Sequence, residues 1–335
     1  MLKSHSLPLA HSRVRLVKFG RLKPVEFIRQ LYKSEPLLVV DVGARGGFAE
    51  FPALRDFMEV YLLEPDPVAA AELRARYSGS TNSSVHEIAL AASSGNAEFF
   101  LTDQASMSSL LKSDSHGFNR SFGEMKNAPQ WLSGMNLKET ISVKTQTLSE
   151  FVSANHIAHI DFLKLDTQGT ELDILKSGEQ LLRSGKVNVI CAEVAFFPVY
   201  NGQAFFSDID LFLRDCGFRL VECRTYTEVL NREDEYTMNG KLYEKPKRAP
   251  VGDAWYVFDW NPEKQKQQSL RSAAILASET YFSEAKHLMK DELKADEMTE
   301  LFRFLSAGTR ESGWKHFLRR WTPLAIQQWR AKNRK

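Results

Sequence analysis

The stretch LLVVDVGARGG, residues 37–47, determines what kind of fold this chain can adopt. Leu37–Val40 is a continuous apolar run, which is typical of a strand buried on both faces of a parallel sheet. The glycines that follow predict a turn in which backbone N–H groups approach a ligand, with a helix N-terminus behind them. A buried strand followed by such a turn indicates an α/β fold with a ligand site at the carboxyl end of the strand.

The chain up to residue 258 continues in the same alternation of strands and helices, which predicts a doubly wound sheet. Before residue 96, the expected elements are the helix Ala49–Met58, the strand Val60–Leu63, the helix Pro67–Tyr77 and a strand near Val85–Leu90. Two further strands are expected at Ala97–Thr102 and Ile141–Thr147. After residue 147, the expected elements are the strands Ile160–Leu165, Val187–Val194, Arg219–Cys223 and Ala254–Phe258, and the helices Thr170–Leu182 and Phe206–Cys216.

Three segments fall outside this alternation, and they divide the chain. Residues 1–33 form a basic N-terminal segment with a short amphipathic helix over 20–33. Residues 96–147 hold two strand-like pieces around a polar stretch, so we expect an insertion over the carboxyl edge of the sheet, as a substrate lid would lie. Residues 261–335 are predicted to be a mostly helical extension after the α/β domain at 34–260.

The composition is that of an ordinary globular protein. Of the 335 residues, 43% are hydrophobic and 26% are charged. No apolar run approaches the ~18–20 residues that a membrane span needs. The N-terminus lacks the continuous apolar stretch of a secretory signal, and the three cysteines show no metal-ligand spacing. We therefore expect a protein of the reducing cytoplasm.

The net charge of +2 is distributed unevenly along the chain. Residues 1–33 and 309–335 each carry eight Lys or Arg and one acid, so each end is +7 and residues 34–308 together are −12. Such basic ends could direct the protein to an anionic lipid surface, a nucleic acid or an acidic glycan. Solvated, frayed termini explain the same pattern. Peripheral contact with a membrane surface is therefore left open.

The spacing of the glycine turn indicates the kind of ligand. A dinucleotide fingerprint requires G-x-G-x-x-G, but Gly43 is followed at plus two by Arg45 and at plus five by Phe48. The pattern present is D-x-G-x-x-x-G, from Asp41 to Gly47. An acid before the glycine suits the amino group of a methionine moiety and would repel a pyrophosphate, whereas a turn capped by Asp41 is the structural alternative. The candidate cofactor contacts in this turn are Asp41, Gly43, Ala44 and Gly47.

A second acid follows the next expected strand. Val60–Leu63 leads into Glu64-Pro65-Asp66-Pro67, and an acid at the tip of this strand can accept hydrogen bonds from both ribose hydroxyls. Glu64 lies 23 residues after Asp41, the separation expected when one helix intervenes. Asp66 is a secondary candidate for the cofactor, because it could instead stabilise the N-terminus of the next helix.

Ordered sequence blocks along residues 37–258 resemble those of FkbM-type methyltransferases. The blocks are DVGARGG, LLEPDP, IAL, SMSSLL, DFLKLDTQGTELDIL and EVAFFPVYNGQAFFSDIDLFLRDCGF. LKLDTQG-x-E and Y-x-G-Q are the most specific of them, since neither follows from a generic nucleotide-binding pattern. Three residues differ from those common in the family. Arg45 stands where an asparagine is common, Gly46 where an apolar residue is usual, and Gln168 where a glutamate is frequent.

The resemblance implies a fold, a cofactor and an activity. The fold would be a Rossmann-like class I methyltransferase sheet, mostly parallel and with seven strands. The cofactor would be S-adenosylmethionine, and Ala89 in the IAL block joins its expected contacts. The activity would be O-methylation of a hydroxyl on a sugar, glycan, glycolipid or related metabolite.

The resemblance places the reaction centre at Asp166, at the carboxyl end of the strand Ile160–Leu165. Lys164 projects to the same side, because the two residues are two apart on a strand. We expect Asp166 to be a general base or to orient the acceptor, with Lys164 holding a carboxylate or contacting the substrate. Alternatively, Asp166, Glu171 or Glu193 binds a divalent ion that polarises the hydroxyl, although no metal is predicted. The candidate acceptor-side residues are Ser108, Gln168, Glu171, Glu193 and Tyr200.

Other classes of function fit the same residues less well. The failed G-x-G-x-x-G spacing disfavours a nicotinamide oxidoreductase. An exocyclic-amine methylase would carry a Pro-Pro-aromatic tetrapeptide at its catalytic residue, and none follows Asp166, so no nucleic-acid partner is expected. The acids at 41, 64 and 166 speak against a non-catalytic binding protein of the same fold. A homodimer is left open.

Overall fold

The computed structural model describes residues 23–123, 125, 127–229, 237–238, 241–242, 247–289 and 292–307. Most of the basic charge at the two ends lies in residues 1–22 and 308–335, outside the described residues. Contact with a membrane surface through these ends therefore stays a prediction. Within the described residues, no helix is both long enough and apolar enough to span a bilayer.

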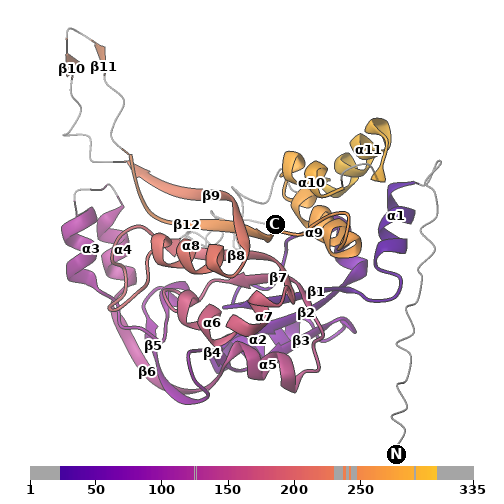
Figure 1. Cartoon of the computed structure of the whole chain (residues 1–335). Helices are drawn as coiled ribbons and strands as arrows, with labels where there is room; N and C mark the ends of the chain where they lie inside the picture. The colour runs from indigo at the N-terminus through magenta and orange to yellow at the C-terminus, as the bar shows by residue number, and fades with distance from the viewer. Residues whose placement is uncertain are drawn as a thin grey trace, which may run out of the picture.

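A seven-stranded sheet forms the centre of the described part of the chain (Figure 1). Its strands, in spatial order, are β3 (Ser83–His86), β2 (Met58–Leu63), β1 (Leu37–Val42), β7 (Ile160–Leu165), β8 (Val187–Ala195), β12 (Lys247–Phe258) and β9 (Phe218–Val229). From β3 through β8, neighbouring strands are parallel, and β12 runs antiparallel to both β8 and β9. This order confirms the predicted class I methyltransferase sheet, and β1 lies at the point where the strand order reverses.

Helices cover both faces of this sheet. The helices whose side chains share a core with one face are α5 (Leu148–Ala154), α6 (Glu171–Ser177), α7 (Glu179–Arg183) and α8 (Phe206–Asp215). Those that share a core with the other face are α1 (Pro24–Leu31), α2 (Pro67–Arg76), α9 (Lys266–Ser278), α10 (Phe282–Met289) and α11 (Ala295–Leu305). Figure 1 shows α1 beside α9–α11, although they come from opposite ends of the chain. The predicted helical extension is confirmed within the described residues, and its helices complete the core of the sheet.

The helix predicted at Ala49–Met58 is wrong. The structure has a short 3₁₀ helix there, η1 (Pro52–Phe57), directly before β2. Phe51 has a left-handed backbone with φ of 56°, which ends any helix that would begin earlier. Pro52 is tolerated only in the first turn of a helix, so a single short segment remains before the strand begins.

The other predicted helices and strands differ less from those in the structure. The helix predicted at Thr170–Leu182 is divided into α6 and α7 at Gly178, where a side chain would meet Leu148 of α5. The strand expected near Val85–Leu90 is also divided, because β3 ends at His86 and a separate strand, β4 (Ala89–Leu90), follows. β9 and β12 are confirmed and extend beyond the predicted ranges. The short strands β10 (Thr237–Met238) and β11 (Lys241–Leu242) form a separate antiparallel pair.

The insertion at 96–147 adds a second sheet and two helices. Its elements are β5 (Gly95–Thr102), η2 (Ala105–Met107), α3 (Ser115–Phe122), α4 (Ala128–Gly134) and β6 (Leu137–Gln146). The predicted strand Ala97–Thr102 is confirmed as part of β5, and the one predicted at Ile141–Thr147 as part of β6, which ends at Gln146 because Thr147 caps α5. β6 also pairs with β4. The two helices were not predicted, because the polar stretch hides contacts such as the stacking of Phe118 on Trp131, whose ring centroids are 5.2 Å apart. A lid role stays a prediction.

A buried ion pair joins α9 to the amino end of β7. Arg271 donates from Nε to Oδ1 of Asp161 over 2.7 Å and from Nη2 to Oδ2 over 2.5 Å. The two residues are 2% and 0% exposed. Arg271 also donates to the carbonyl oxygen of Pro36, and its guanidinium lies 4.6 Å from the ring centre of Tyr32. The C-terminal helices are therefore held to the sheet by a charge pair as well as by apolar packing.

Candidate functional site

The carboxyl ends of β1, β2 and β7 open onto a cavity of about 610 Å³. Its walls come from the glycine turn, the acid after β2, the β4 segment, the insertion around η2 and the loop after β7. Pockets of roughly 300–1,000 Å³ are typical of small-molecule sites. Most of the predicted site residues line this cavity, namely Asp41, Gly43, Ala44, Gly47, Glu64, Ala89, Ser108, Lys164, Asp166 and Gln168. The predicted residues that are not among its lining residues are Asp66, Glu171, Glu193 and Tyr200.

Two glycines of the turn, Gly43 and Gly47, are required by contacts within the protein. The backbone of Gly43 has φ of 85°, and a Cβ there would lie 2.0 Å from the carbonyl oxygen of Asp166. The N–H groups of Gly43 and Ala44 both donate to the carbonyl oxygen of Leu63, so they face β2, and the approach of the turn to a ligand stays a prediction. At Gly47, a Cβ would meet the side chains at the end of α2. The turn therefore fits tightly between β2, β7 and α2.

Gly43→Ala is expected to destabilise the protein by about 1–3 kcal/mol, because a methyl group would push the turn away from β7. The measurement is urea unfolding. Gly46→Ala is the matched control in the same turn, since a Cβ at Gly46 meets nothing within 4 Å. Equal unfolding midpoints for the two variants would contradict the close contact at Gly43.

Two acids and a lysine lie at the junction of β1 and β7. Asp41 and Lys164 are paired in register on these neighbouring strands. Lys164 Nζ lies 3.8 Å from Asp41 Oδ1 and 3.0 Å from Glu50 Oε1. A buried carboxylate needs charge compensation, and Lys164 supplies it here. Of the two predicted roles for Lys164, the structure thus shows the one in which it holds carboxylates.

Glu64 is buried at the end of β2, beside a cation. Its Oε1 accepts from the backbone N–H of Asp66 over 3.0 Å and lies 3.8 Å from Arg45 Nη2. Burial raises the pKa of Glu64 to about 7, although the positive charge of Arg45 opposes the rise. Asp66 forms an ion pair with Arg45 and accepts from the N–H of Val68 as the N-cap of α2. Asp66 therefore has the structural role that the sequence left as its alternative.

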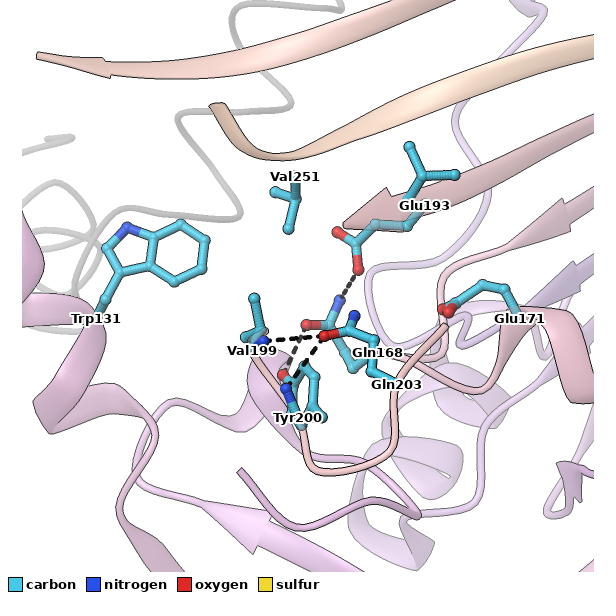
Figure 2. Close-up of a pocket in the computed structure, with 9 residues that line it drawn as sticks. Trp131, Gln168, Glu171, Glu193, Val199, Tyr200, Gln203 and Val251 are labelled. Atoms are coloured by element: carbon cyan, nitrogen blue, oxygen red, sulfur yellow. Dashed lines mark hydrogen bonds between the residues drawn. The ribbon is translucent and has the colours of Figure 1, made fainter. Parts of the chain in front are cut away.

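Gln168 joins three predicted site residues in one hydrogen-bond network, and Figure 2 shows its contacts with Glu193 and Tyr200. Its Nε2 donates to Asp166 Oδ1 over 3.0 Å and to Glu193 Oε2 over 2.5 Å. Its Oε1 accepts from the Tyr200 hydroxyl over 2.9 Å. This orientation of the amide is favoured, because the opposite one would direct its oxygen at two carboxylates. Gln168 has a left-handed backbone with φ of 61°, an uncommon conformation that the surrounding contacts hold.

Gln168 also lines a second, small cavity (Figure 2), so the two cavities share this residue. The volume of the small cavity is about 10 Å³, room for about one water molecule. Trp131 of α4, Glu193 at the end of β8 and Tyr200 line it together with Gln168. The insertion, the sheet and the loop after β8 thus meet at this point, beside Asp166.

Glu171 stabilises the loop after β7. Its carboxylate accepts from the N–H of Thr167 over 2.8 Å and from the N–H of Gly169 over 3.0 Å. Burial raises the pKa of Glu171, and these backbone hydrogen bonds oppose the rise. Within the described residues, no three His, Cys, Asp or Glu side chains gather as metal ligands. Asp166 and Glu193 are bridged by the N–H groups of Gln168 and are not presented together to a cation.

Two further residues lie at this network: Ser109, which the sequence offers together with Ser108 as a contact of cofactor or substrate, and Trp131. The Ser109 hydroxyl donates to the carbonyl oxygen of Gln168 over 2.8 Å and so fixes its backbone. Ser108, the predicted neighbour, accepts from the N–H of Thr102 over 3.1 Å. Trp131 was not predicted, and only its aromatic character within a polar stretch could have indicated it.

The model of the methyltransferase FkbM domain matches residues 41–220, which hold the carboxyl end of β1, all of β2, β7 and β8, and the residues that line the large cavity. The chain belongs to the FkbM methyltransferase family. This FkbM protein is 26% identical over 211 residues to the 2-O-methyltransferase NoeI of Sinorhizobium fredii, an alignment that covers 60% of this chain and 84% of that one. It is therefore a methyltransferase, of a kind that generally uses S-adenosylmethionine.

Solved structures with a similar fold share little sequence with this FkbM protein. The methyltransferase FkbM of Methylobacillus flagellatus is 13% identical with a TM-score of 0.36, and the match covers 74% of this chain and 46% of that one. This chain thus spans less than half the length of that structure. The putative RNA methyltransferase PH1948 of Pyrococcus horikoshii is 13% identical with a TM-score of 0.31, covering 70% and 82%. Likenesses this weak support no conclusion about the substrate.

Proposed function

We propose that this protein methylates a hydroxyl group of a sugar, glycan, glycolipid or related metabolite, with S-adenosylmethionine as the methyl donor. One observation carries the proposal, the presence of the strand-end carboxylates Asp41, Glu64 and Asp166 at a single cavity. The 26% identity to a protein named as a 2-O-methyltransferase supports an oxygen acceptor. The acids divide the cavity into a cofactor end and a reaction end.

The cofactor end fits S-adenosylmethionine in size and in chemistry. Asp41 would accept from the amino group of the methionine part, and Glu64 would accept from the ribose hydroxyls. Ala89 and Leu90 of β4 would place apolar surface beside the base. When bound, the cofactor supplies a methyl group on a positively charged sulfur that is already electrophilic. The protein then mainly has to align the acceptor with that methyl group and to exclude water.

Asp166 would take the proton of the acceptor hydroxyl. An aliphatic hydroxyl is hardly ionised at neutral pH, so a positioned carboxylate helps by accepting the proton as the new bond forms. Gln168 holds one oxygen of Asp166 at 3.0 Å and so fixes the orientation of the carboxylate. Lys164 pairs with Asp41 and Glu50, so we assign it to the cofactor end and not to proton transfer.

Two measurements test the proposal. Calorimetry with S-adenosylhomocysteine should show binding, and release of S-adenosylhomocysteine from S-adenosylmethionine should occur with a member of a panel of hydroxylated acceptors. A protein that binds neither nucleotide would end the proposal. Binding without turnover on any acceptor would instead favour a non-catalytic protein of the same fold. Steeply salt-dependent binding to RNA or DNA, used as a control, would favour a nucleic-acid substrate.

The affinity for S-adenosylhomocysteine is expected to rise roughly tenfold between about pH 6 and about pH 8. The pKa of Glu64 is about 7, so the carboxylate is mostly protonated at the lower pH and mostly ionised at the higher one. Only the ionised form can accept from both ribose hydroxyls. The measurement is calorimetry at each pH, with the wild type compared with Glu64→Gln. Titration of the ligand itself affects both proteins equally, so the difference between their pH dependences belongs to Glu64.

Glu64→Gln should bind more weakly at the higher pH and should lose the component of pH dependence that belongs to Glu64. Glu72→Gln is the control, since Glu72 is an exposed acid that lines the same cavity. This variant should keep the pH dependence of the wild type. A Glu64→Gln variant with the full wild-type pH dependence would contradict the ribose assignment.

A further inference from the structure

A row of aromatic rings runs from the glycine turn to the C-terminal helices. We call it the aromatic row, and its members are Phe48, Phe51, Phe162, Trp255 and Tyr281. Successive ring centroids are 5.7, 4.9, 5.3 and 5.6 Å apart. Phe162 lies on β7 and Trp255 on β12, while Tyr281 lies between α9 and α10. These separations are those of directly packed aromatic pairs.

The surrounding structure fixes both ends of the aromatic row. Near one end, the second ring, Phe51, is fully buried, and its backbone φ is 56°, a conformation that a bulky residue keeps only where its surroundings impose it. At the other end, the Arg224 guanidinium lies 4.6 Å from the ring centre of Tyr281 and 5.5 Å from that of Trp255. Arg224 is itself held by Glu279, at the end of α9, over 2.9 Å.

The first two rings lie on the loop of residues 44–51, which we call the cofactor loop, because it also forms part of the cofactor end. Glu50 lies between Phe48 and Phe51, and its Oε1 is 3.0 Å from Lys164 Nζ. Lys164 in turn lies 3.8 Å from Asp41, the acid that faces the cavity. A shift of the loop would therefore change the charges around Asp41.

We propose that Trp255 and Tyr281 are positioning residues for the cofactor loop, so that the C-terminal helices form part of the cofactor site. The proposal rests on the proposed function, since it takes the cavity to bind S-adenosylmethionine. Trp255 and Tyr281 lie outside the residues that match the family, 41–220, so the family match assigns them no role. Loosening the aromatic row lowers the fraction of protein molecules whose cofactor loop has the binding conformation. The apparent affinity for the cofactor falls in proportion to that fraction.

Tyr281→Leu is expected to raise the Kd for S-adenosylhomocysteine and the KM for S-adenosylmethionine by about 5–10-fold. The kcat and the KM for the acceptor should stay within about twofold of the wild type, because no ring of the row is among the residues that line either cavity. Tyr281→Phe keeps the ring and should restore wild-type values. Phe282→Leu is the matched control, since its ring stacks on Phe302 at 5.1 Å and does not join the row.

A second variant and a double variant test whether the effect passes through the loop. Phe48→Leu should also weaken binding of S-adenosylhomocysteine. The double variant with Tyr281→Leu should bind about as weakly as the weaker single variant, whereas independent effects would multiply. Hydrogen exchange adds a readout that needs no ligand, and the amides of residues 44–51 should exchange faster in Tyr281→Leu while those of α8 stay unchanged.

The outcomes separate this inference from the proposed function. A wild type that does not bind S-adenosylhomocysteine overturns the proposed function. A wild type that binds it, together with a Tyr281→Leu variant of unchanged Kd, overturns the positioning role alone. The same holds if Phe282→Leu weakens binding as much as Tyr281→Leu, or if the acceptor KM rises together with that of the cofactor.

Discussion

Arg271→Ala is expected to lower the free energy of unfolding by about 3–5 kcal/mol. The change would leave the Asp161 carboxylate in the core without the guanidinium that binds both of its oxygens. The N–H of Leu38 at 2.8 Å and Nδ2 of Asn188 at 2.9 Å remain as uncharged donors, and His159 Nε2 lies 3.4 Å from Oδ2. Together they do not replace the two charged hydrogen bonds from the guanidinium. Loss of the contact with Tyr32 and the space left by the side chain add to the effect.

Urea unfolding of the wild type and the variant measures this effect. Arg183→Ala is the matched control, because Arg183 forms ion pairs with Glu179 and Asp215 at the exposed surface. Surface ion pairs contribute little, so this control should unfold at the midpoint of the wild type. If the two arginine variants unfolded alike, the buried pair would not be what holds α9 to the sheet.

The stability that Asp161 contributes should also depend on pH. Burial alone would raise the pKa of Asp161, but hydrogen bonds and charge from Arg271 and His159 outweigh it and hold the pKa below the usual value of 3.8. A lowered folded pKa means that the stabilisation is present above about pH 4 and is lost as the pH falls through the folded pKa. The difference between the wild type and Arg271→Ala should therefore shrink in acid.

The strands could be placed from the sequence because each is a short apolar run between turn signals. β7 has the predicted bounds, Ile160–Leu165, since it is buried along its length and Asp166 ends the run. The helix at Ala49–Met58 could not be excluded, because Phe51 and Leu54 supply the apolar positions of an amphipathic helix. In the structure both side chains are buried, but Phe51 has a left-handed backbone and Leu54 lies in a 3₁₀ helix. Hydrophobic periodicity indicates which side chains are buried, but it does not show which backbone conformation places them there.

The acids of the site could be predicted because parallel strands bring their carboxyl ends to one edge of a sheet. The contacts that orient them could not. Gln168 bonds to Glu193, 25 residues away, and to Tyr200, 32 residues away, and no local pattern links these positions. Arg271 and Asp161 are 110 residues apart, and the basic side chain stands in a helix otherwise rich in small and apolar residues. Such pairs follow from tertiary packing, which a single sequence does not display.

Asp166→Asn is expected to lower kcat by about 10²–10⁴-fold, while the Kd for S-adenosylhomocysteine changes by less than about threefold. The asparagine oxygen can still accept from Gln168 Nε2, so the network around the site keeps its shape. An amide cannot accept a proton from the acceptor hydroxyl, and the chemical step therefore slows. The measurement is release of S-adenosylhomocysteine at saturating cofactor, together with calorimetry.

Glu193→Gln is the matched control, because Glu193 is the other carboxylate bonded to the Gln168 amide. It lines the small cavity and not the cofactor-sized one, so its loss should reduce kcat by less than about tenfold. A larger effect at Glu193 than at Asp166 would transfer the role of base to Glu193. The pH profile separates a base from an orienting group. Without its base, the Asp166→Asn enzyme should become faster with rising pH as hydroxide ionises the acceptor, whereas an orienting role would leave the profile parallel to that of the wild type.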